Sequence, residues 1–344
     1  MEINKLLFFS LSLALILGFV QSFDYNEKEL ESEEGLKNMY NRWRDHHKVT
    51  EKSTERFNVF KANVQHVHNH NKMNKPYKLK INKFADMTHK EFRSNFASDN
   101  NDPLRNVMLQ AGGAPPPPPG DVKDLPPRVD WREKNAVTAV RTRGQCGSTN
   151  LFAAVGSVEG INAIRTGQLI TLSEQQFLDC FEPGMHSLAD VFNWFKEKGV
   201  ATAESYPYVG SKGTCDESKF GRYLVTIDGF ERVLSNEEAM MKVVAQQPVA
   251  FFISLGPDVQ SYSEGIYSGP CGMEGDAETM LIVGYGETSD GTKYWIVKNV
   301  LGEEWGEKGY VRLPRGLQQP LGYCDMYGYN LIPLKSIETR NTEL

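Results

Sequence analysis

The sequence predicts an α+β protein with one helical and one strand-rich lobe, preceded by a separate helical region. Three observations support this prediction. The 344 residues exceed the size of an ordinary single domain. Five consecutive prolines at 115–119 divide the chain, and all five cysteines lie after them. Beyond the prolines, helical patterns come before strand patterns, which is typical of helices and sheet in separate layers.

Residues 1–22 predict a cleaved secretory signal peptide. Lys5 precedes the apolar run LLFFSLSLALILGFV, and small polar residues follow it. The run is too short to cross a bilayer comfortably, because a spanning helix needs about 20 apolar residues. We therefore expect the protein to enter the secretory pathway. Its destination is then the extracellular space, a vacuole or lysosome-like compartment, or a compartment derived from the endoplasmic reticulum.

Residues 23–123 are charged, lack cysteine and predict helices at Glu34–His47 and Glu55–Asn71. One stripe of the second helix is apolar and consists of Phe57, Phe60, Val64 and Val67. The segment AGGAPPPPPGD at 111–121 forms neither helix nor sheet, so we expect an extended, exposed tether.

Residues 124–335 predict the main domain, and 336–344 a tail. Apolar spacing indicates helices at Leu151–Arg165 and Leu188–Lys198. Strands are predicted for the apolar runs LVTIDGF, PVAFFISL, MLIVGYG and KYWIVKNV.

The net charge of −6 carries no basic stripe, which argues against nucleic acid or an anionic membrane as a partner. Solubility is a sufficient reason for the acidity. We expect a monomer without cofactor or metal ion. A secretory route permits disulfides, and the odd cysteine count leaves at least one thiol unpaired.

Several motifs in order resemble the papain family of cysteine proteases. The domain resembles the family through LPPRVDWREKNAVT, KYWIVKN, EEWGEKGY and Cys324. The upstream region resembles its inhibitory propeptide: Arg56, Phe60, Asn63, Val67 and Asn71 fall at the spacing of the long propeptide helix, with Lys52 where Glu is usual, and Asn82, Phe84 and Asp86 match a second motif. Plant endopeptidases with a KDEL-type tail look most similar, and the final NTEL resembles a decayed form of that tail.

The resemblance implies a papain-like fold, in which a helical lobe and a β-barrel-like lobe follow an inhibitory propeptide of the cathepsin type. It also implies the disulfides Cys180–Cys215 and Cys271–Cys324. Cys146 then remains as a free thiol, which is either reactive or a half-buried residue without its partner.

The resemblance places Thr149 of the segment CGSTN at the family's nucleophilic cysteine. Glu278, 129 residues later, stands where the family has His, and Asn299, 150 residues later, where it has Asn. A threonine hydroxyl needs a strong, positioned base. A glutamate with an ordinary pKa of about 4.3 is too weak for that. Of the seven histidines only His186 follows the tether, on a different segment.

Other parts of the family's site are also replaced. Arg143 stands where a glutamine helps to form the oxyanion hole, and Asn150 and Leu301 stand where the family has tryptophans. The loop FEPGMHSLADVF at 181–192 is shortened and lacks the second cysteine and the glycine pair of the family's loop, whose backbone pairs with the substrate peptide.

These residues leave three functions open. The first is an inactive protease homologue that acts by binding cystatin-like protease inhibitors, a propeptide or a pathogen protein. The second is a peptidase with residual or altered activity, with Thr149 as nucleophile rather than an ordinary helix residue. The third is a decaying paralogue or storage-like protein. Across the cleft we expect Arg143 to pair with Glu278 directly or through one water, with Thr149 nearby; the alternative is that both charges point into solvent.

Overall fold

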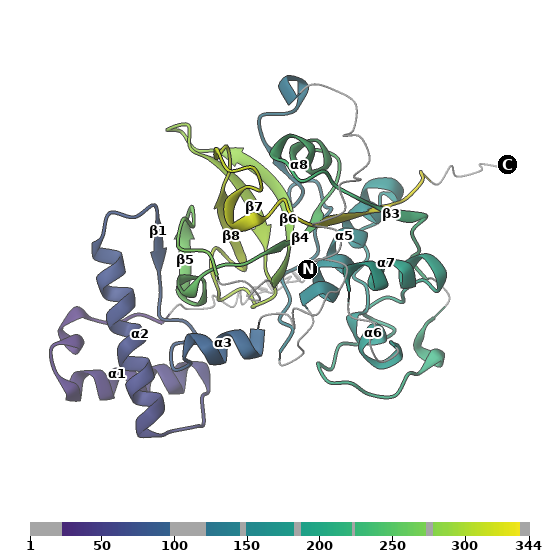
Figure 1. Ribbon diagram of the computed structural model, residues 1–344. Coiled ribbons are helices and arrows are strands. Elements are labelled where there is room, and N and C mark those ends of the chain that lie inside the picture. The colour runs from purple at the N-terminus through teal and green to yellow at the C-terminus, as the bar shows by residue number, and fades with distance from the viewer. Residues whose placement is uncertain are drawn as a thin grey trace, which may run out of the picture.

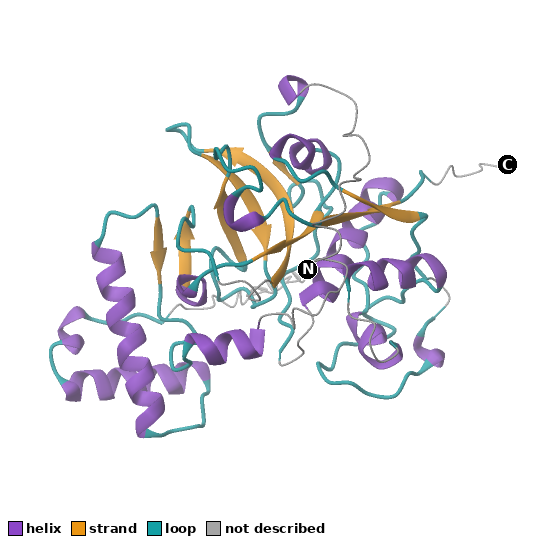
Figure 2. Ribbon diagram, viewed as in Figure 1, coloured by secondary structure: helices purple, strands orange, loops and turns teal. Residues whose placement is uncertain are grey.

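The computed structural model describes residues 23–96, 122–144, 149–181, 187–221, 224–272 and 278–337. Two lobes lie side by side, and a helical unit made of residues 23–96, here called the N-terminal unit, packs against the strand-rich lobe (Figures 1 and 2). The predicted α+β class is thus confirmed. The predicted signal peptide, the proline tether, the NTEL end, Cys146 and His186 lie outside the described residues.

The N-terminal unit is built on two crossing helices. Its elements are η1 (Glu27–Leu30), α1 (Glu33–His47), α2 (Thr54–Lys72), β1 (Tyr77–Leu79) and α3 (His89–Phe96). Ser32 and Ser53 cap α1 and α2 by accepting from backbone N–H groups, as their sequence positions favour. The predicted apolar stripe of α2 is buried, and Phe60 packs 5.2 Å from the ring of Trp43, centroid to centroid.

The helical lobe is centred on α5 (Thr149–Thr166), around which α6 (Glu174–Cys180), α7 (Leu188–Glu197) and η3 (Glu217–Lys219) lie. Every residue of α5 from Thr149 to Ala163 is buried, because the helix also packs against the strand-rich lobe. Glycine is required on one face of it: a Cβ at Gly160 would lie 2.6 Å from the ring of Pro248. Helices α5 and α7 confirm the helices predicted at 151–165 and 188–198.

The strand-rich lobe is an antiparallel sheet in the order β3-β9-β4-β6-β7-β8, with β2 paired to β6. Its elements, with the short helices beside them, are η2 (Val122–Asp124), β2 (Val129–Asp130), β3 (Gly229–Arg232), α8 (Glu237–Val244), β4 (Val249–Ile253), η4 (Pro257–Ser261), β5 (Tyr262–Gly265), β6 (Glu278–Glu287), β7 (Lys293–Lys298), β8 (Tyr310–Pro314), η5 (Tyr323–Asp325) and β9 (Asn330–Leu334).

Three of the four predicted strands are confirmed as β4, β6 and β7. The prediction over LVTIDGF was wrong for most of its length. There the strand begins only at Gly229, and Val225 forms an isolated bridge with Val200 in the helical lobe. The segment is a connection between the lobes, and Val225 and Ile227 are buried by tertiary contacts rather than by a sheet, whereas Leu224 is exposed.

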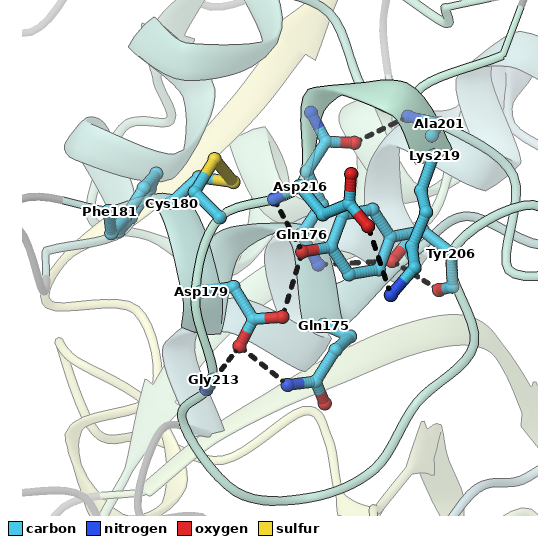
Figure 3. Close-up of a disulfide and its surroundings, with 12 residues drawn as sticks. Gln175, Gln176, Asp179, Cys180, Phe181, Ala201, Tyr206, Gly213, Asp216 and Lys219 are labelled. Atoms are coloured by element: carbon cyan, nitrogen blue, oxygen red, sulfur yellow. Dashed lines mark hydrogen bonds and ion pairs between the residues drawn. A yellow bond between two sulfur atoms is a disulfide. The ribbon is translucent and has the colours of Figure 1, made fainter.

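Both disulfides implied by the resemblance are present, with Cα–Cα distances of 4.6 Å for Cys180–Cys215 and 5.3 Å for Cys271–Cys324. Figure 3 shows how the first bridge lies beside Asp179 at the end of α6. The Asp179 carboxylate accepts hydrogen bonds from Gln175 Nε2 at 2.8 Å, Tyr206 OH at 2.8 Å and Gly213 N at 2.6 Å. These bonds hold the long loop after α7 against α6.

The N-terminal unit docks on the strand-rich lobe through a strand pair that forms a separate two-stranded sheet. Strand β1 pairs antiparallel with β5, with Tyr77 opposite Gly265. Gly265 has φ +93°, and a Cβ there would lie 2.2 Å from Pro76 O, so glycine permits this close approach. Asn82 Nδ2 donates to Gln260 O at 2.7 Å, and Gln260 Nε2 donates back to Phe84 O at 2.9 Å.

Of the described residues, no helix is both long and apolar enough to span a membrane.

Candidate functional site

Thr149 lies at the boundary between the lobes, as the first residue of α5, and is 1% exposed. Its Oγ1 accepts a hydrogen bond from Thr279 N at 3.0 Å, and the Thr279 hydroxyl donates to Asn150 Oδ1. Thr279 is the second residue of β6. The side chains of Thr149 and Asn150 therefore connect the helical lobe to the strand-rich lobe.

Glu278 begins β6, immediately before Thr279, and pairs with Ile253 of β4. Burial raises the pKa of its carboxyl group to about 7, while the nearby positive charges of Arg143 and Arg93 act in the opposite direction. This corrects the sequence-based argument that Glu278 has the basicity of an ordinary glutamate. Its protonation changes near neutral pH, in the range where general acids and bases operate.

Arg143 is completely buried, so the alternative in which it points into solvent is wrong. Its Nη2 donates to Asn95 O in the last turn of α3 at 3.0 Å, and its guanidinium carbon lies 5.6 Å from the Phe96 ring centroid. Carbonyls at a helix C-terminus have no partner within the helix and attract a cation. The positive charge of Arg143 also acts on Glu278, where it offsets part of the rise in pKa that burial causes.

The direct form of the expected Arg143–Glu278 latch needs a correction, whereas a latch through one water stays a prediction. The hydrogen bond described for the Arg143 side chain goes to Asn95 of the N-terminal unit rather than to the Glu278 carboxylate. The backbone of Arg143 is held as well, since its N–H donates to Val300 O at 3.2 Å and its carbonyl accepts from Tyr208 OH at 2.6 Å. The sequence-based expectation considered only the two lobes and omitted the helix end that enters between them.

Asn299 follows β7 and is 2% exposed. Its side-chain Oδ1 accepts from Val300 N at 2.7 Å, and its own N–H donates to Gly309 O at 3.0 Å. These two bonds give Asn299 a structural role at the end of β7. Next to it, Leu301 is 2% exposed and forms an isolated bridge with Thr142.

A buried charged cluster behind the site was missed by sequence reasoning. Arg141 Nη2 lies 2.8 Å from Glu159 Oε1 in α5, and Arg141 Nη1 lies 2.6 Å from Glu174 Oε1 in α6. Lys298 Nζ donates to Thr138 O at 2.8 Å, and burial lowers its pKa to about 8. Two sequence features could have indicated it: Glu159 is a single acidic residue within the apolar helix α5, and Lys298 ends the apolar strand β7. The cluster fixes the position of α5 relative to β7.

Two family models match the chain. The model of papain family cysteine proteases matches residues 125–334, and the model of the cathepsin propeptide inhibitor domain matches residues 40–92. The second match falls within the N-terminal unit. That unit is called the propeptide from here on.

Curated relatives are similar along almost their whole length. Vignain of Vigna mungo is 47% identical over 347 residues, covering 98% of this chain and 96% of that protein. The KDEL-tailed cysteine endopeptidase CEP2 of Arabidopsis thaliana is 44% identical over 347 residues, covering 96% and 95%.

Solved structures of proforms are similar in the same way. The crystal structure of the Amb a 11 cysteine protease, a ragweed pollen allergen, in its proform has a TM-score of 0.83 at 46% identity and covers 92% of this chain and 99% of that chain. A recombinant stem bromelain precursor has a TM-score of 0.77 at 33% identity, covering 87% and 99%. The expected two-lobed fold with a docked propeptide is thus confirmed.

Proposed function

The chain belongs to the papain family of cysteine proteases, and we propose that it acts by binding other proteins rather than by cleaving peptide bonds. The observation that supports this most directly is the residue at the start of α5. Thr149 stands there as a buried alcohol whose Oγ1 accepts a hydrogen bond from Thr279 N at 3.0 Å. In the proposal this position corresponds to the family's nucleophilic cysteine.

The difference between a thiol and an alcohol decides the argument. A cysteine thiol has an ordinary pKa of about 8.5, and a helix N-terminus and an imidazolium lower it further. An alcohol is not ionised in this way and requires a base that removes its proton during attack. Glu278, rather than a histidine, occupies the first position of β6 beside it. Arg143, which we place at the oxyanion position, is directed to Asn95 O.

We propose two classes of binding partner. The propeptide is one partner, and in the described structure it contacts the strand-rich lobe through β1 and reaches Arg143 through α3. Cystatin-like protease inhibitors are the second, as membership of the papain family suggests. The predicted signal peptide and a relative with a KDEL tail support passage through the secretory pathway.

One observation favours a second function, that of a peptidase with altered chemistry. The pKa of Glu278 is raised to about 7 by burial, which gives its carboxylate more basicity than an exposed glutamate has. Glu278 and Thr149 flank the same residue, Thr279, whose N–H donates to Thr149 Oγ1. A weak threonine-dependent hydrolysis would use Glu278 as base.

Two experiments separate these functions. The full chain, and the chain after an added protease has removed the propeptide, are incubated with a fluorogenic peptide across acid and neutral pH. We expect no hydrolysis above that of Thr149→Ala. Hydrolysis that disappears in both Thr149→Ala and Glu278→Gln would establish the altered peptidase instead.

The binding function has its own test. The chain without its propeptide is passed over an immobilised cystatin, with the full chain as the matched control. We expect retention only after the propeptide has been removed, because the propeptide occupies the region beside Arg143 in the full chain. Failure of the processed and still folded chain to bind excludes this class of partner.

A further inference from the structure

A group of potential ligand atoms lies where the propeptide meets the strand-rich lobe. His66 and His70 are four residues apart in α2, so they lie on one face of the helix. Asp258 of η4 faces them across the interface, and its side chain is 7% exposed. One ligand atom from each residue lies within 4.8 Å of the other two.

The hydrogen bonds of His70 define which of its nitrogens faces Asp258. His70 Nε2 lies 3.2 Å from Tyr77 O, and a carbonyl oxygen only accepts, so Nε2 carries the proton. In the neutral ring Nδ1 then presents its lone pair to Asp258 Oδ2, 3.6 Å away. Two electron-rich atoms facing each other at this distance repel, whereas a cation between them is attracted to both.

The remaining contacts are those that surround metal ligands in proteins. A histidine that binds a metal usually donates its other N–H to a carbonyl or carboxylate, as His70 does to Tyr77 O. Tyr77 OH donates to Asp258 Oδ2 at 2.6 Å and thereby orients the carboxylate. His66 Nε2 lies 2.7 Å from Asp258 Oδ1, and the His66 side chain is 55% exposed, which leaves both an entry path and freedom to rotate.

We propose that His66, His70 and Asp258 form a Zn²⁺ site that fastens the propeptide to the strand-rich lobe. Two imidazoles and one carboxylate suit zinc, and water on the exposed side of His66 completes a tetrahedral set. Zinc displaces the proton that His66 Nε2 shares with Asp258 Oδ1: from a doubly protonated ring this proton goes to solvent, and Nδ1 keeps its own proton, so the bound ring is neutral. This proposal differs from the expectation, made from the sequence, that the protein binds no metal ion.

The proposed zinc site spans two parts of the molecule, so zinc binding is coupled to docking of the propeptide. Two ligands belong to the propeptide and one to the strand-rich lobe, and His66 and Asp258 are separated by 192 residues. The three ligands come together only while the propeptide is docked. By linkage, zinc therefore stabilises the docked state over the undocked one.

Isothermal titration calorimetry of the full chain with ZnCl₂ at neutral pH tests the proposal. The measurement is made in the Cys146→Ser background, because a free thiol would itself bind zinc. We expect one zinc ion per chain, a rise in melting temperature on addition of zinc, and reversal by EDTA. Absence of binding in this background would overturn the proposal.

Variants identify the site. His66→Gln is the first choice, because this exposed side chain can be replaced without disturbing the core, and His70→Gln is the second. Each is expected to weaken zinc binding by at least about tenfold, and Tyr77→Phe by about 10–100-fold through the orientation of Asp258. The matched control is His68→Gln, on the same helix, where the ring lies 3.9 Å from Glu27 Oε1 and outside the group. Equal affinity in His66→Gln and His68→Gln would contradict the assignment.

Discussion

At the scale of single residues, burial determines the protonation of Glu278 at the candidate site, and the buried guanidinium of Arg143 lies near enough to affect it. Glu278 has its pKa raised to about 7 by burial, and Arg143 and Arg93 only partly oppose this effect. The folded chain therefore holds a proton at Glu278 that the unfolded chain, with an ordinary glutamate pKa of about 4.3, releases at lower pH.

The sign of this shift predicts how stability depends on pH. Because the folded pKa lies above the unfolded one, the stabilising contribution is complete at pH values below the ordinary glutamate pKa. It is lost as the pH rises through about 7. Glu278→Gln resembles the protonated form, so we expect the variant to melt several degrees higher than the parent at pH 8 and close to it near pH 4.5, at roughly 2–4 °C per kcal/mol.

Thermal melting of both proteins across this pH range measures the effect. Glu231→Gln, an exposed position in β3, is the matched control and should follow the parent at every pH. Parallel curves for Glu278→Gln and the parent would show that the carboxyl group is not held in its neutral form.

At the scale of elements, the docking of the propeptide depends on a short strand and one buried amide. Asn82 is 3% exposed, its Nδ2 donates to Gln260 O at 2.7 Å, and its Oδ1 accepts from Phe84 N at 3.0 Å. The side chain thus links the propeptide to η4, directly beside the pairing of β1 with β5.

Removal of this amide is predicted to loosen β1. Asn82→Ala leaves Phe84 N and Gln260 O without these bonds, at a cost of about 1–3 kcal/mol. If that cost falls on the docked state, hydrogen exchange of the amides in β1 should accelerate by about 5–150-fold.

Mass spectrometry of hydrogen exchange in the full chain measures this rate. Asn58→Ala, an exposed asparagine on α2, should leave the exchange of β1 unchanged. If β1 exchanges equally slowly in Asn82→Ala, the amide does not contribute to docking.

At the scale of the whole molecule, the fold is that of a proform, in which α3 reaches the boundary of the two lobes. Arg143 donates to Asn95 O there, so the oxyanion position that we propose is bound to the propeptide. Thr149 and Asn150 are bonded to Thr279 across the same boundary. The two lobes and the propeptide are thus bonded to one another at this boundary.

We predict that the purified protein keeps its full length at acid pH unless another protease is added. Self-cleavage requires a nucleophile, and in the function proposed above Thr149 does not act as one. The double variant Thr149→Cys with Glu278→His is expected to recover little proteolysis, because Arg143, Asn150 and the shortened loop remain and groups that act as a unit do not contribute additively. Gel electrophoresis over time shows the result, and spontaneous conversion of the parent protein would contradict the prediction.

Local sequence patterns determined those elements whose stability is set within one segment. The apolar spacing of α2, α5 and α7 predicted helices that are present, and the motifs of the resemblance implied both disulfides. For LVTIDGF the apolar pattern gave a wrong prediction, because such a run is found both in strands and in buried connections between two lobes.

Only the tertiary structure decided the properties that depend on which distant segments meet. The pKa of Glu278 is set by the burial of its carboxyl group, and Arg143 binds Asn95, 48 residues earlier in the chain. The approach of His66 to Asp258 spans 192 residues, and the pairing of β1 with β5 lies in the same interface. Electrostatic energies depend on distance and on exclusion of water, and neither quantity is contained in the spacing of residues along the chain.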